Sequence, residues 1–386
     1  MNGKKNIGIL VPSIETGGME RTASRLSKML SEYGFNVFLI VFKYDRLRAY
    51  PYKGKIIVSP CKIDNSSFSK EVISYIVDAG LIKDIKKKYN IETTISISQE
   101  MNLINILSDV NDKKILTIHN CMSVRTDINS LAYNKIIMLL SNLAYKIVTV
   151  SEWCANDLHK KYFLPKKKIT VIYNPLGIKH RERIEKDKKP IVLTVGRLEK
   201  VKRQWHIIKA FKSVHDRIPG AELWLAGDGP EKEKLEKLAE QLKIKDKVKF
   251  LGFVKNVDEL YGKAKIFVLS SESESFSCVA VEAMANGIPI VASDFPGGIR
   301  EVVMADYKET KYPIDAAAGY ITKNHEKSSS GYSADISQTE YEMGRAMEKL
   351  LLNESIYREK SQNCIKNIGR FDSERILAQW TELLKD

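Results

Sequence analysis

Short apolar runs that alternate with stretches of helical spacing place the strongest constraint on the fold of this chain. The runs are continuous, without alternating polar residues, which is typical of parallel strands covered by helices on both faces. Before residue 178 they are Ile7–Val11, Phe35–Phe42, Thr94–Ile97, Ile115–Ile118, Ile147–Val150 and Thr170–Ile172. After residue 190 they are Ile191–Val195, Glu222–Ala226, Val248–Leu251, Ile266–Leu269 and Ile288–Ala292. The pattern predicts an α/β protein.

An interruption of this alternation predicts two domains. The 386 residues exceed one ordinary core, and the segment Gly177–Pro190 holds six Lys and Arg residues but no core-forming pattern, so we interpret it as a linker. We expect Rossmann-like, doubly wound domains over residues 1–178 and 190–370, facing a central cleft. The expected helices are Met19–Tyr33, Ser69–Tyr89, Leu131–Tyr145, Trp205–Arg217, Glu231–Leu242, Val257–Gly262, Phe276–Asn286, Glu340–Leu352, Asn353–Asn367 and Asp372–Leu384. The last helix, within residues 372–386, is expected to pack back on the first domain.

The net charge of +14 is confined to the first half of the chain. Residues 1–189 contain 32 Lys and Arg against 18 Asp and Glu, whereas residues 190–386 contain 30 of each. This asymmetry favours an anionic partner for the first half, such as a membrane surface, a phosphorylated substrate or nucleic acid. Lysines that merely solvate loops are an equally good explanation.

The cysteine pattern and the hydropathy lead us to expect a cytoplasmic protein. The five cysteines are scattered and form no C-x-x-C pair, which argues against a disulfide framework or a cysteine-based zinc site. No stretch approaches the roughly 18 apolar residues of a membrane-spanning helix, and the first 12 residues hold too short an apolar run for a signal peptide. The protein is therefore expected to be soluble or bound to the inner face of a membrane.

Candidate phosphate-binding residues follow two of the predicted strands, where open parallel sheets bind their ligands. Gly196, Arg197 and Lys202 follow the run 191–195, and a guanidinium fork beside an ammonium suits a pyrophosphate. The tight turn Gly227-Asp228-Gly229-Pro230 follows the run 222–226, and its glycines permit close backbone approach to a ligand. Taken singly, these motifs also fit solvated cations and an ordinary turn.

The segment after the run 266–269 carries the strongest signal. Glu274 precedes an expected helix, and Glu282 lies within it in an otherwise apolar stretch, where a carboxylate needs a partner. Glu282 is suited to accept hydrogen bonds from a ribose, and Glu274 from a sugar ring. The helix start offers free N–H groups to an anion, at Ser275, Phe276, Ser277 and Cys278. The alternative for Glu274 is a carboxylate that only stabilises the helix dipole.

The spacing of the two glutamates disfavours a glycosidase. Eight residues along a helix span about 12 Å. A retaining pair of carboxyl groups needs about 5 Å, and an inverting pair at most about 9.5 Å. Glu274 and Glu282 are therefore expected to hold two parts of one long ligand.

Taken together, these motifs resemble the retaining glycosyltransferases of family 4, whose two-domain architecture is called GT-B. The resemblance extends over most of the chain through Gly17-Gly18-Met19-Glu20-Arg21, Val150-Ser151-Glu152 and Val171-Ile172-Tyr173-Asn174-Pro175. It implies that Gly17 and Gly18 approach the donor phosphates. It also implies that His119, which follows a predicted strand, lies near the donor sugar. Without the resemblance, a structural histidine would be the better interpretation of His119.

The resemblance further implies how the donor is bound. Arg197 and Lys202 would hold the pyrophosphate, Glu282 the ribose and Glu274 the transferred sugar, with His119 and Glu274 at the reacting centre. The remaining donor-binding residues would be Gly227, Phe276, Ser277 and Cys278. Retention by front-face displacement, with the leaving phosphate drawing in the acceptor proton, is the usual proposal for the family.

The sequence departs from the family pattern at three positions. Ser275 and Ser277 stand where glycines are common, which puts the backbone geometry of this loop in doubt, and Arg203 stands where glycine is common after the lysine. The chain has no D-x-D, the metal-chelating signature of the other main transferase fold. We therefore expect no metal and no cofactor, and the cations and the helix terminus would act in place of a divalent ion.

The acceptor side leaves alternatives open. Lys160, Lys161 and Lys166–Lys168 lie close in sequence to Tyr162–Leu164, a mixture suited to an anionic membrane where lipid-linked acceptors reside. The apolar segment Leu131–Tyr145 is either a membrane-lying face or a core helix.

The expected activity is transfer from a nucleotide sugar, most simply a UDP-sugar, to a surface polysaccharide or a lipid-linked oligosaccharide. The alternatives are an epimerase on the same fold and a basic nucleic-acid-binding protein. We expect no nucleic-acid partner, because the chain has no recognised module and no basic ribbon with interleaved aromatic residues.

Overall fold

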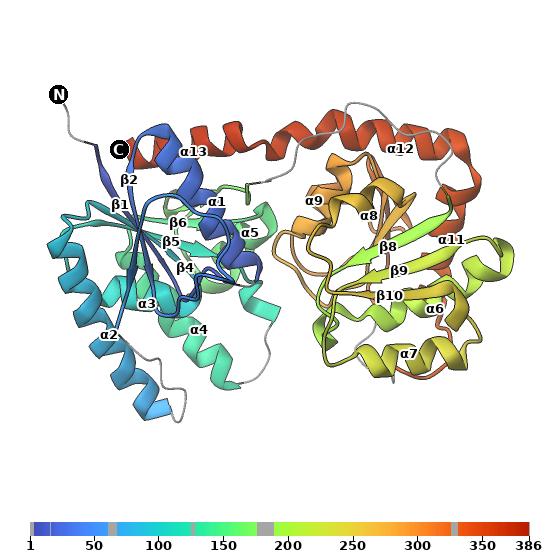
Figure 1. The fold of residues 1–386 in the computed structure, drawn as a ribbon, viewed down its shortest axis with the longest axis horizontal. Coiled ribbons are helices and arrows are strands. Elements are labelled where there is room, and N and C mark those ends of the chain that lie inside the picture. The colour runs from blue at the N-terminus through green and yellow to red at the C-terminus, as the bar shows by residue number, and fades with distance from the viewer. Residues whose placement is uncertain are drawn as a thin grey trace. The chain divides into compact units, whose positions relative to one another are not determined.

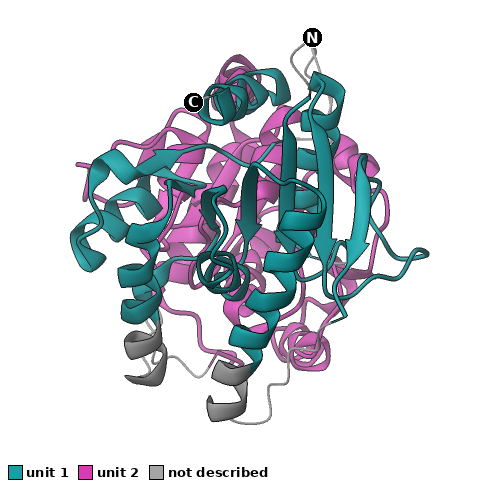
Figure 2. Ribbon diagram, turned by 90° about the vertical axis from the view of Figure 1, so that its left-hand side faces the viewer, with its two compact units in different colours: residues 1–177, 371–386 teal, residues 178–370 magenta. Residues whose placement is uncertain are grey.

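The computed structural model describes residues 4–15, 17–60, 68–124, 128–175, 189–325 and 331–385. They form two α/β units, drawn in teal and magenta in Figure 2: unit 1 comprises residues 1–177 and 371–386, and unit 2 comprises residues 178–370. Most of the expected linker, and residues 326–330, lie outside the described residues.

Unit 1 contains a seven-stranded parallel sheet in the order β3-β2-β1-β4-β5-β6-β7. Its strands are β1 (Asn6–Val11), β2 (Asn36–Val41), β3 (Lys55–Val58), β4 (Thr93–Ile97), β5 (Lys113–Ile118), β6 (Lys146–Thr149) and β7 (Ile169–Val171). Its helices are α1 (Gly18–Tyr33), α2 (Phe68–Lys88), α3 (Gln99–Leu107), α4 (Ile128–Leu140), α5 (Glu152–Tyr162) and α13 (Ser373–Lys385), with 3-10 turns η1 (Met122–Val124), η2 (Ser141–Leu143) and η3 (Lys166–Lys168).

Alternate residues of β1 enter two separate cores, because successive side chains of a strand point to opposite faces of the sheet. Ile7 and Ile9 of β1 pack in a cluster with residues of α1 and α13, including Trp380. Leu10, which points to the opposite face of the sheet, belongs to the cluster that includes residues of α2 and α3. The C-terminal helix therefore completes the first core, far in sequence from the other helix that covers it (Figure 1).

Unit 2 repeats the arrangement in the order β10-β9-β8-β11-β12-β14-β13, with only β13 antiparallel. Its strands are β8 (Ile191–Val195), β9 (Glu222–Ala226), β10 (Val248–Gly252), β11 (Ile266–Leu269), β12 (Ile290–Ser293), β13 (Ile314–Ala316) and β14 (Gly319–Thr322). Its helices are α6 (Gln204–Arg217), α7 (Lys232–Gln241), α8 (Asp258–Lys263), α9 (Cys278–Ala285), α10 (Ile299–Val303), α11 (Gln338–Leu352) and α12 (Glu354–Asn367), and the 3-10 turn η4 (Lys200–Lys202) follows β8.

The structure confirms the α/β fold class and corrects several elements. The short strands β3, β13 and β14 and the helices α3, α5 and α10 were not predicted. The apolar segment Leu131–Tyr145 is not one helix, because α4 ends at Leu140 and η2 follows it. None of the helices in the described parts of the chain combines the length and apolar character needed to span a bilayer.

The strand orders fix where ligands are expected. In each sheet the order reverses beside the first strand of the unit, between β1 and β4 and between β8 and β11. Ligands of doubly wound sheets bind beyond the carboxyl ends of the strands at such a point. The loops after these four strands are therefore the candidate ligand-binding segments of the two units.

Candidate active site

In unit 2 the loops after β8 and β11 meet through one ion pair. The Lys202 ammonium, at the end of η4, lies 2.7 Å from Oε1 of Glu274 in the loop after β11. Sequence reasoning assigned Lys202 to phosphate and Glu274 to sugar, but it did not foresee their contact, because 72 positions separate them. The structure places both at the switch point of the sheet.

The Glu274 carboxylate is held from three directions. Beside Lys202, Ser271 Oγ donates to Oε1 at 2.5 Å and Ser277 Oγ donates to Oε2 at 2.8 Å. Burial raises the pKa of Glu274, but the Lys202 charge and these hydrogen bonds outweigh it and leave the pKa below its usual value. Glu274 is therefore ionised at neutral pH and is a hydrogen-bond acceptor, not a general acid.

Two of the three departures from the family pattern occupy left-handed backbone, where glycine is favoured. Ser277 has a φ of 36° and Arg203 a φ of 49°. Each is stabilised by its side chain: Ser277 binds Glu274, and Arg203 Nη2 lies 3.1 Å from Glu272 Oε1. The backbone carbonyl of Arg203 also accepts a hydrogen bond from Ser270 Oγ at 2.8 Å. The loop thus keeps the conformation that glycines allow and adds side-chain contacts.

The loop after β12 fixes the backbone of Glu274. The Glu274 N–H donates to the Pro296 carbonyl, and the Gly298 N–H donates to the Glu274 carbonyl, both at 3.2 Å. Arg300 Nε and Nη2 hold Asp294 in the same loop at 2.8 and 2.5 Å. The position of the carboxylate is therefore set by three loops together.

The glycines after β9 serve close packing of the loops. A Cβ atom at Gly227 would lie 1.9 Å from the Gly196 carbonyl oxygen, and one at Gly229 would lie 2.4 Å from that of Leu198. These glycines approach protein backbone closely, so packing of the loops is itself a reason for glycine at both positions. Arg197, beyond Gly196, is largely exposed and pairs with Glu199 at 3.0 Å.

Glu282 has a protein partner that sequence reasoning missed. It lies on α9, is 1% exposed, and accepts a hydrogen bond from Tyr261 Oη on α8 at 3.2 Å. Its isolation among apolar residues therefore does not by itself require a ligand. Ribose binding by Glu282 stays a prediction.

The predicted helix start is also corrected. α9 begins at Cys278, with Ser277 as its N-cap, and the Phe276 side chain is buried. Phe276 therefore can offer a ligand only its backbone. Because the segment from Glu274 to Ser277 is not helical, the 12 Å estimate for the separation of Glu274 and Glu282 does not apply.

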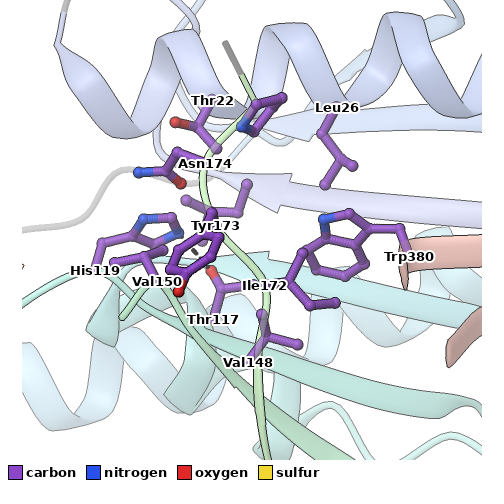
Figure 3. A pocket seen from close by; sticks show the side chains of 12 residues that line it. Thr22, Leu26, Thr117, His119, Val148, Val150, Ile172, Tyr173, Asn174 and Trp380 are labelled. Atoms are coloured by element: carbon purple, nitrogen blue, oxygen red, sulfur yellow. Dashed lines mark hydrogen bonds between the residues drawn. The ribbon is translucent and has the colours of Figure 1, made fainter. Parts of the chain in front are cut away.

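In unit 1, His119 lies at the carboxyl end of β5 and lines a cavity of about 10 Å³, room for one water molecule (Figure 3). His119 Nε2 is 3.0 Å from Thr117 Oγ1. Burial lowers the pKa of His119 to about 4, so the imidazole is neutral at pH 7. The cavity also contacts Thr22 of α1 and Trp380 of α13.

Gly17 and Gly18, at the start of α1, precede Thr22 by about one helical turn. Gly17 is the N-cap of α1 with a φ of 116°, and Gly18 is the first helical residue. Thr22 of α1, which follows these glycines, and His119 line the same cavity. Neither glycine carries a side chain, but the Glu20 carboxylate lies against Gly17, because a Cβ atom there would clash with Glu20 Oε2.

Ser98, at the switch point of unit 1, has a strained backbone that the sequence did not predict. Ser98 follows β4 and has a φ of 113° with a ψ of 164°, a region almost restricted to glycine. Its hydroxyl accepts a hydrogen bond from the Met101 N–H at the start of α3. Such strain clusters at functional sites, but no feature of the sequence around Ser98 announces it.

Comparison with known proteins identifies the family that carries these loops. Residues 178–370 match the family glycosyl transferases group 1, and residues 16–179 match glycosyltransferase family 4. The chain belongs to the group 1 glycosyltransferases. This membership confirms the resemblance and the GT-B fold class inferred from the sequence. It also selects a glycosyltransferase over the nucleic-acid-binding protein and the epimerase that the sequence left open.

Two relatives of this glycosyltransferase are named for a sugar transfer and for amylovoran biosynthesis. It is 27% identical over 310 residues, 77% of this chain and 83% of the relative, to N-acetylgalactosamine-N,N'-diacetylbacillosaminyl-diphospho-undecaprenol 4-alpha-N-acetylgalactosaminyltransferase of Campylobacter jejuni. It is 24% identical over 388 residues, 97% of this chain and 98% of the relative, to the amylovoran biosynthesis glycosyltransferase AmsD of Erwinia amylovora.

Solved structures share the fold at low identity. Anabaena Alr3699/HepE in complex with UDP has a TM-score of 0.76 at 17% identity, over 98% of this chain and 99% of that chain. Staphylococcus aureus TarM, in complex with fondaparinux, alpha-GlcNAc-glycerol and UDP, has a TM-score of 0.78 at 14% identity, over 99% of this chain and all of that one.

Proposed function

We propose that this glycosyltransferase moves a sugar from a UDP-sugar, with retention of the anomeric configuration, to a polymeric or lipid-linked glycan. The observation that carries the proposal is the Lys202–Glu274 pair at the switch point of sheet 2. Of the three N–H donors on Lys202, one binds Glu274, and two remain for phosphate oxygens. Glu274 Oε2, which binds Ser277, keeps a second lone pair for a sugar hydroxyl.

In this proposal each group acts on a different part of the donor. Lys202, with Arg197, stabilises the leaving diphosphate without a metal ion, and Glu282 binds the ribose. The amide groups at the start of α9 and the glycine loop of α1 contribute fixed positive dipole ends. The neutral His119 offers a hydrogen bond near the transferred sugar, not a charge.

Known proteins support the donor and acceptor classes. UDP is bound in structures of the same fold, and the Campylobacter relative is named for a diphospho-undecaprenol acceptor and an α-linked product. An α-linked product from an α-linked nucleotide sugar corresponds to retention. A lipid-linked acceptor would place the enzyme at the inner face of a membrane.

Thermal unfolding with a panel of UDP-, GDP- and ADP-sugars in EDTA tests the donor. A UDP-sugar is expected to raise the Tm in the presence of the chelator, since a ligand that binds only the folded state stabilises it. The proposal for the donor fails if all three classes leave the Tm unchanged. Stabilisation only after Mg²⁺ is added would contradict metal independence.

Retention is tested on the product itself. Proton NMR of the newly formed linkage, from an α-linked donor and a soluble acceptor, should show an α-anomer. A β-linked product would overturn retention while leaving sugar transfer intact.

A further inference from the structure

One surface of unit 1 exposes a row of apolar side chains. We call it the α4 surface and define it by Ile136 and Leu139 on α4, Leu143 on η2, and Phe163, which follows α5; their exposed fractions are 57%, 71%, 72% and 85%. Ile136 and Leu139 have the i, i+3 spacing of one face of α4, and Leu143 lies in η2, which follows α4 directly. The α4 surface therefore comprises one face of α4, extended in sequence by η2.

The opposite face of α4 packs in the core where its side chains are described. Ile137 and Met138 are buried in a cluster with Leu158 of α5 and with Leu164. The two sequence-based interpretations of Leu131–Tyr145 thus apply to different faces of one element: one face is core, and the other presents leucine and isoleucine to solvent. Burial of the core face does not explain the second, exposed face.

Phe163 adds an exposed aromatic ring at a position that disfavours it. It is the left-handed C-cap of α5 with a φ of 57°, where glycine or asparagine is usual. Its N–H binds the Leu158 carbonyl, which closes the helix, while the ring points to solvent. A glycine at position 163 would end the helix equally well, so helix capping does not explain the exposed aromatic ring.

Lysines border the α4 surface. Residues 131–170 contain seven Lys, no Arg and two acidic residues. Lys160 and Lys161 end α5, and η3 consists of three further lysines. Lys168 Nζ donates to the Ala144 carbonyl at 2.6 Å, which joins η3 to the residue after Leu143. Lys168 therefore lies beside the end of the row at Leu143, and Lys160 and Lys161 shortly precede Phe163 in sequence.

We propose that the α4 surface docks unit 1 on an anionic bilayer. Apolar side chains bordered by lysines fit an interfacial contact, in which the apolar row enters the acyl boundary and the ammonium groups meet anionic headgroups. A protein partner is disfavoured, because protein interfaces are enriched in Arg and depleted in Lys, the reverse of this segment. The inference rests on the proposed function in so far as a lipid-linked acceptor lies in such a membrane.

Co-sedimentation of the full chain with vesicles tests the proposal. One vesicle contains phosphatidylcholine alone, and the other contains about a third phosphatidylglycerol. The chain is expected to bind the anionic vesicle, and raising the ionic strength from about 0.05 M to about 0.5 M should weaken that binding, because exposed charges are screened. Lys160→Gln with Lys161→Gln should reduce affinity for the anionic vesicle about fivefold per lysine.

The apolar row is tested by Leu139→Gln with Leu143→Gln, which keeps the helix propensity. Vesicle affinity should fall about tenfold or more, since burial of a single leucine contributes a factor of that size. The matched control is Leu47→Gln with Leu352→Gln, two leucines that are 96% and 63% exposed outside the α4 surface. This control should bind vesicles as the native chain does.

Three outcomes overturn the docking proposal. They are no binding to either vesicle, equal binding by the Leu139/Leu143 variant and the control, or a dimer in sedimentation velocity that the Leu139/Leu143 variant abolishes while vesicles stay unbound. Stabilisation by UDP is measured on the same samples and does not depend on vesicles. Loss of vesicle binding with intact UDP binding rejects the docking surface alone, and the reverse result rejects the proposed donor site alone.

Discussion

At the scale of single residues, the Lys202–Glu274 ion pair would couple the phosphate binding proposed for Lys202 to the sugar binding proposed for Glu274. A lysine on a flexible stem is poorly placed for catalysis unless something orients it, and Glu274 does so at 2.7 Å. In return, the ammonium keeps the buried carboxylate ionised. Each residue therefore positions the other, whatever part of the proposed donor it binds.

Replacement of Lys202 by methionine should reduce kcat/KM for sugar transfer about 10²–10³-fold, the usual effect of removing a group that stabilises developing charge. The remaining Glu274 loses its counter-ion, so its pKa should rise. Lys212→Met is the matched control, because the Lys212 side chain is 28% exposed against 29% for Lys202 and pairs with Asp216 on the surface of the same unit. Similar activity losses in both variants would contradict the assigned role.

Glu282 accepts a hydrogen bond from Tyr261, so a role of Glu282 in ligand binding can be tested separately from its role in the fold. Glu282→Gln should weaken UDP binding about tenfold or more, as expected when a buried hydrogen bond to a charged acceptor is lost. Tyr261→Phe removes the protein partner but keeps the carboxylate, so UDP affinity should be nearly native. Calorimetric titration with UDP measures both, and equal affinities for the two variants would make Glu282 a purely structural acid.

Ser277 offers a test of the left-handed backbone. Alanine and glycine both remove the hydroxyl that binds Glu274, but only glycine relieves the φ of 36°. Ser277→Ala should therefore be less stable than Ser277→Gly by about 1 kcal/mol, the cost of a Cβ atom in this region. Urea unfolding measures the difference, and an alanine variant as stable as the glycine variant would show that the loop relaxes.

At the scale of elements, the sequence predicted the strands whose residues are buried along nearly their whole length. Strands such as β8 and β11 are apolar along nearly their whole length because helices cover both faces, so they stand out. β3 was missed because it is a four-residue edge strand that is exposed at both ends. α4 was only half predicted, because an apolar run does not reveal that one of its faces points to solvent.

The same limit applies to the site. Residue types and spacing predicted Lys202, Glu274 and Glu282, because each follows or enters an element that local patterns define. Their partners were not predictable: Tyr261 comes from a different helix, and the Lys202–Glu274 contact spans two loops. Local sequence therefore indicated the groups, while the switch-point topology decided which of them meet.

Behind this site, α6 and the segment before α11 bury two stacked histidines. The rings of His206 and His325 are 3.8 Å apart at 9°, and His206 Nδ1 lies 2.7 Å from Glu340 Oε1. Burial lowers the pKa of both rings, that of His325 to about 2. Two neutral rings can stack, but two imidazolium ions would repel each other in a space that also holds Arg203 and Lys209.

Acid should therefore destabilise unit 2. The pKa of His325 is lower in the folded than in the unfolded state, so stability is present above the unfolded value of about 6.5 and is lost as the pH falls below it. This histidine alone should cost about 2 kcal/mol between pH 7.5 and pH 5. Urea unfolding across this range measures the slope, and His325→Gln should flatten it. An unchanged slope in the variant would exclude His325 as the cause.

At the scale of the whole molecule, the chain leaves unit 1, forms unit 2 and returns. Residues 371–386 belong to unit 1, where Trp380 packs in the core with residues of α1 and lines the His119 cavity. Unit 1 therefore lacks part of its main core until the last helix is in place. The stability of the proposed His119 site thus depends on a residue more than 250 positions away in sequence.

Trp380→Ala should remove about 3–5 kcal/mol from the stability of unit 1, as large buried aromatic side chains do. Hydrogen-exchange mass spectrometry should then show faster exchange in β1, β2 and α1, which share its core. Trp205→Ala is the reciprocal control. Trp205 is buried in the main core of unit 2, so its replacement should accelerate exchange in that unit. If each substitution loosens both units equally, the two cores unfold as one cooperative body. If only the matching unit responds, the C-terminal helix stabilises the first unit on its own account, and the His119 cavity loses its wall while the Lys202–Glu274 pair stays intact.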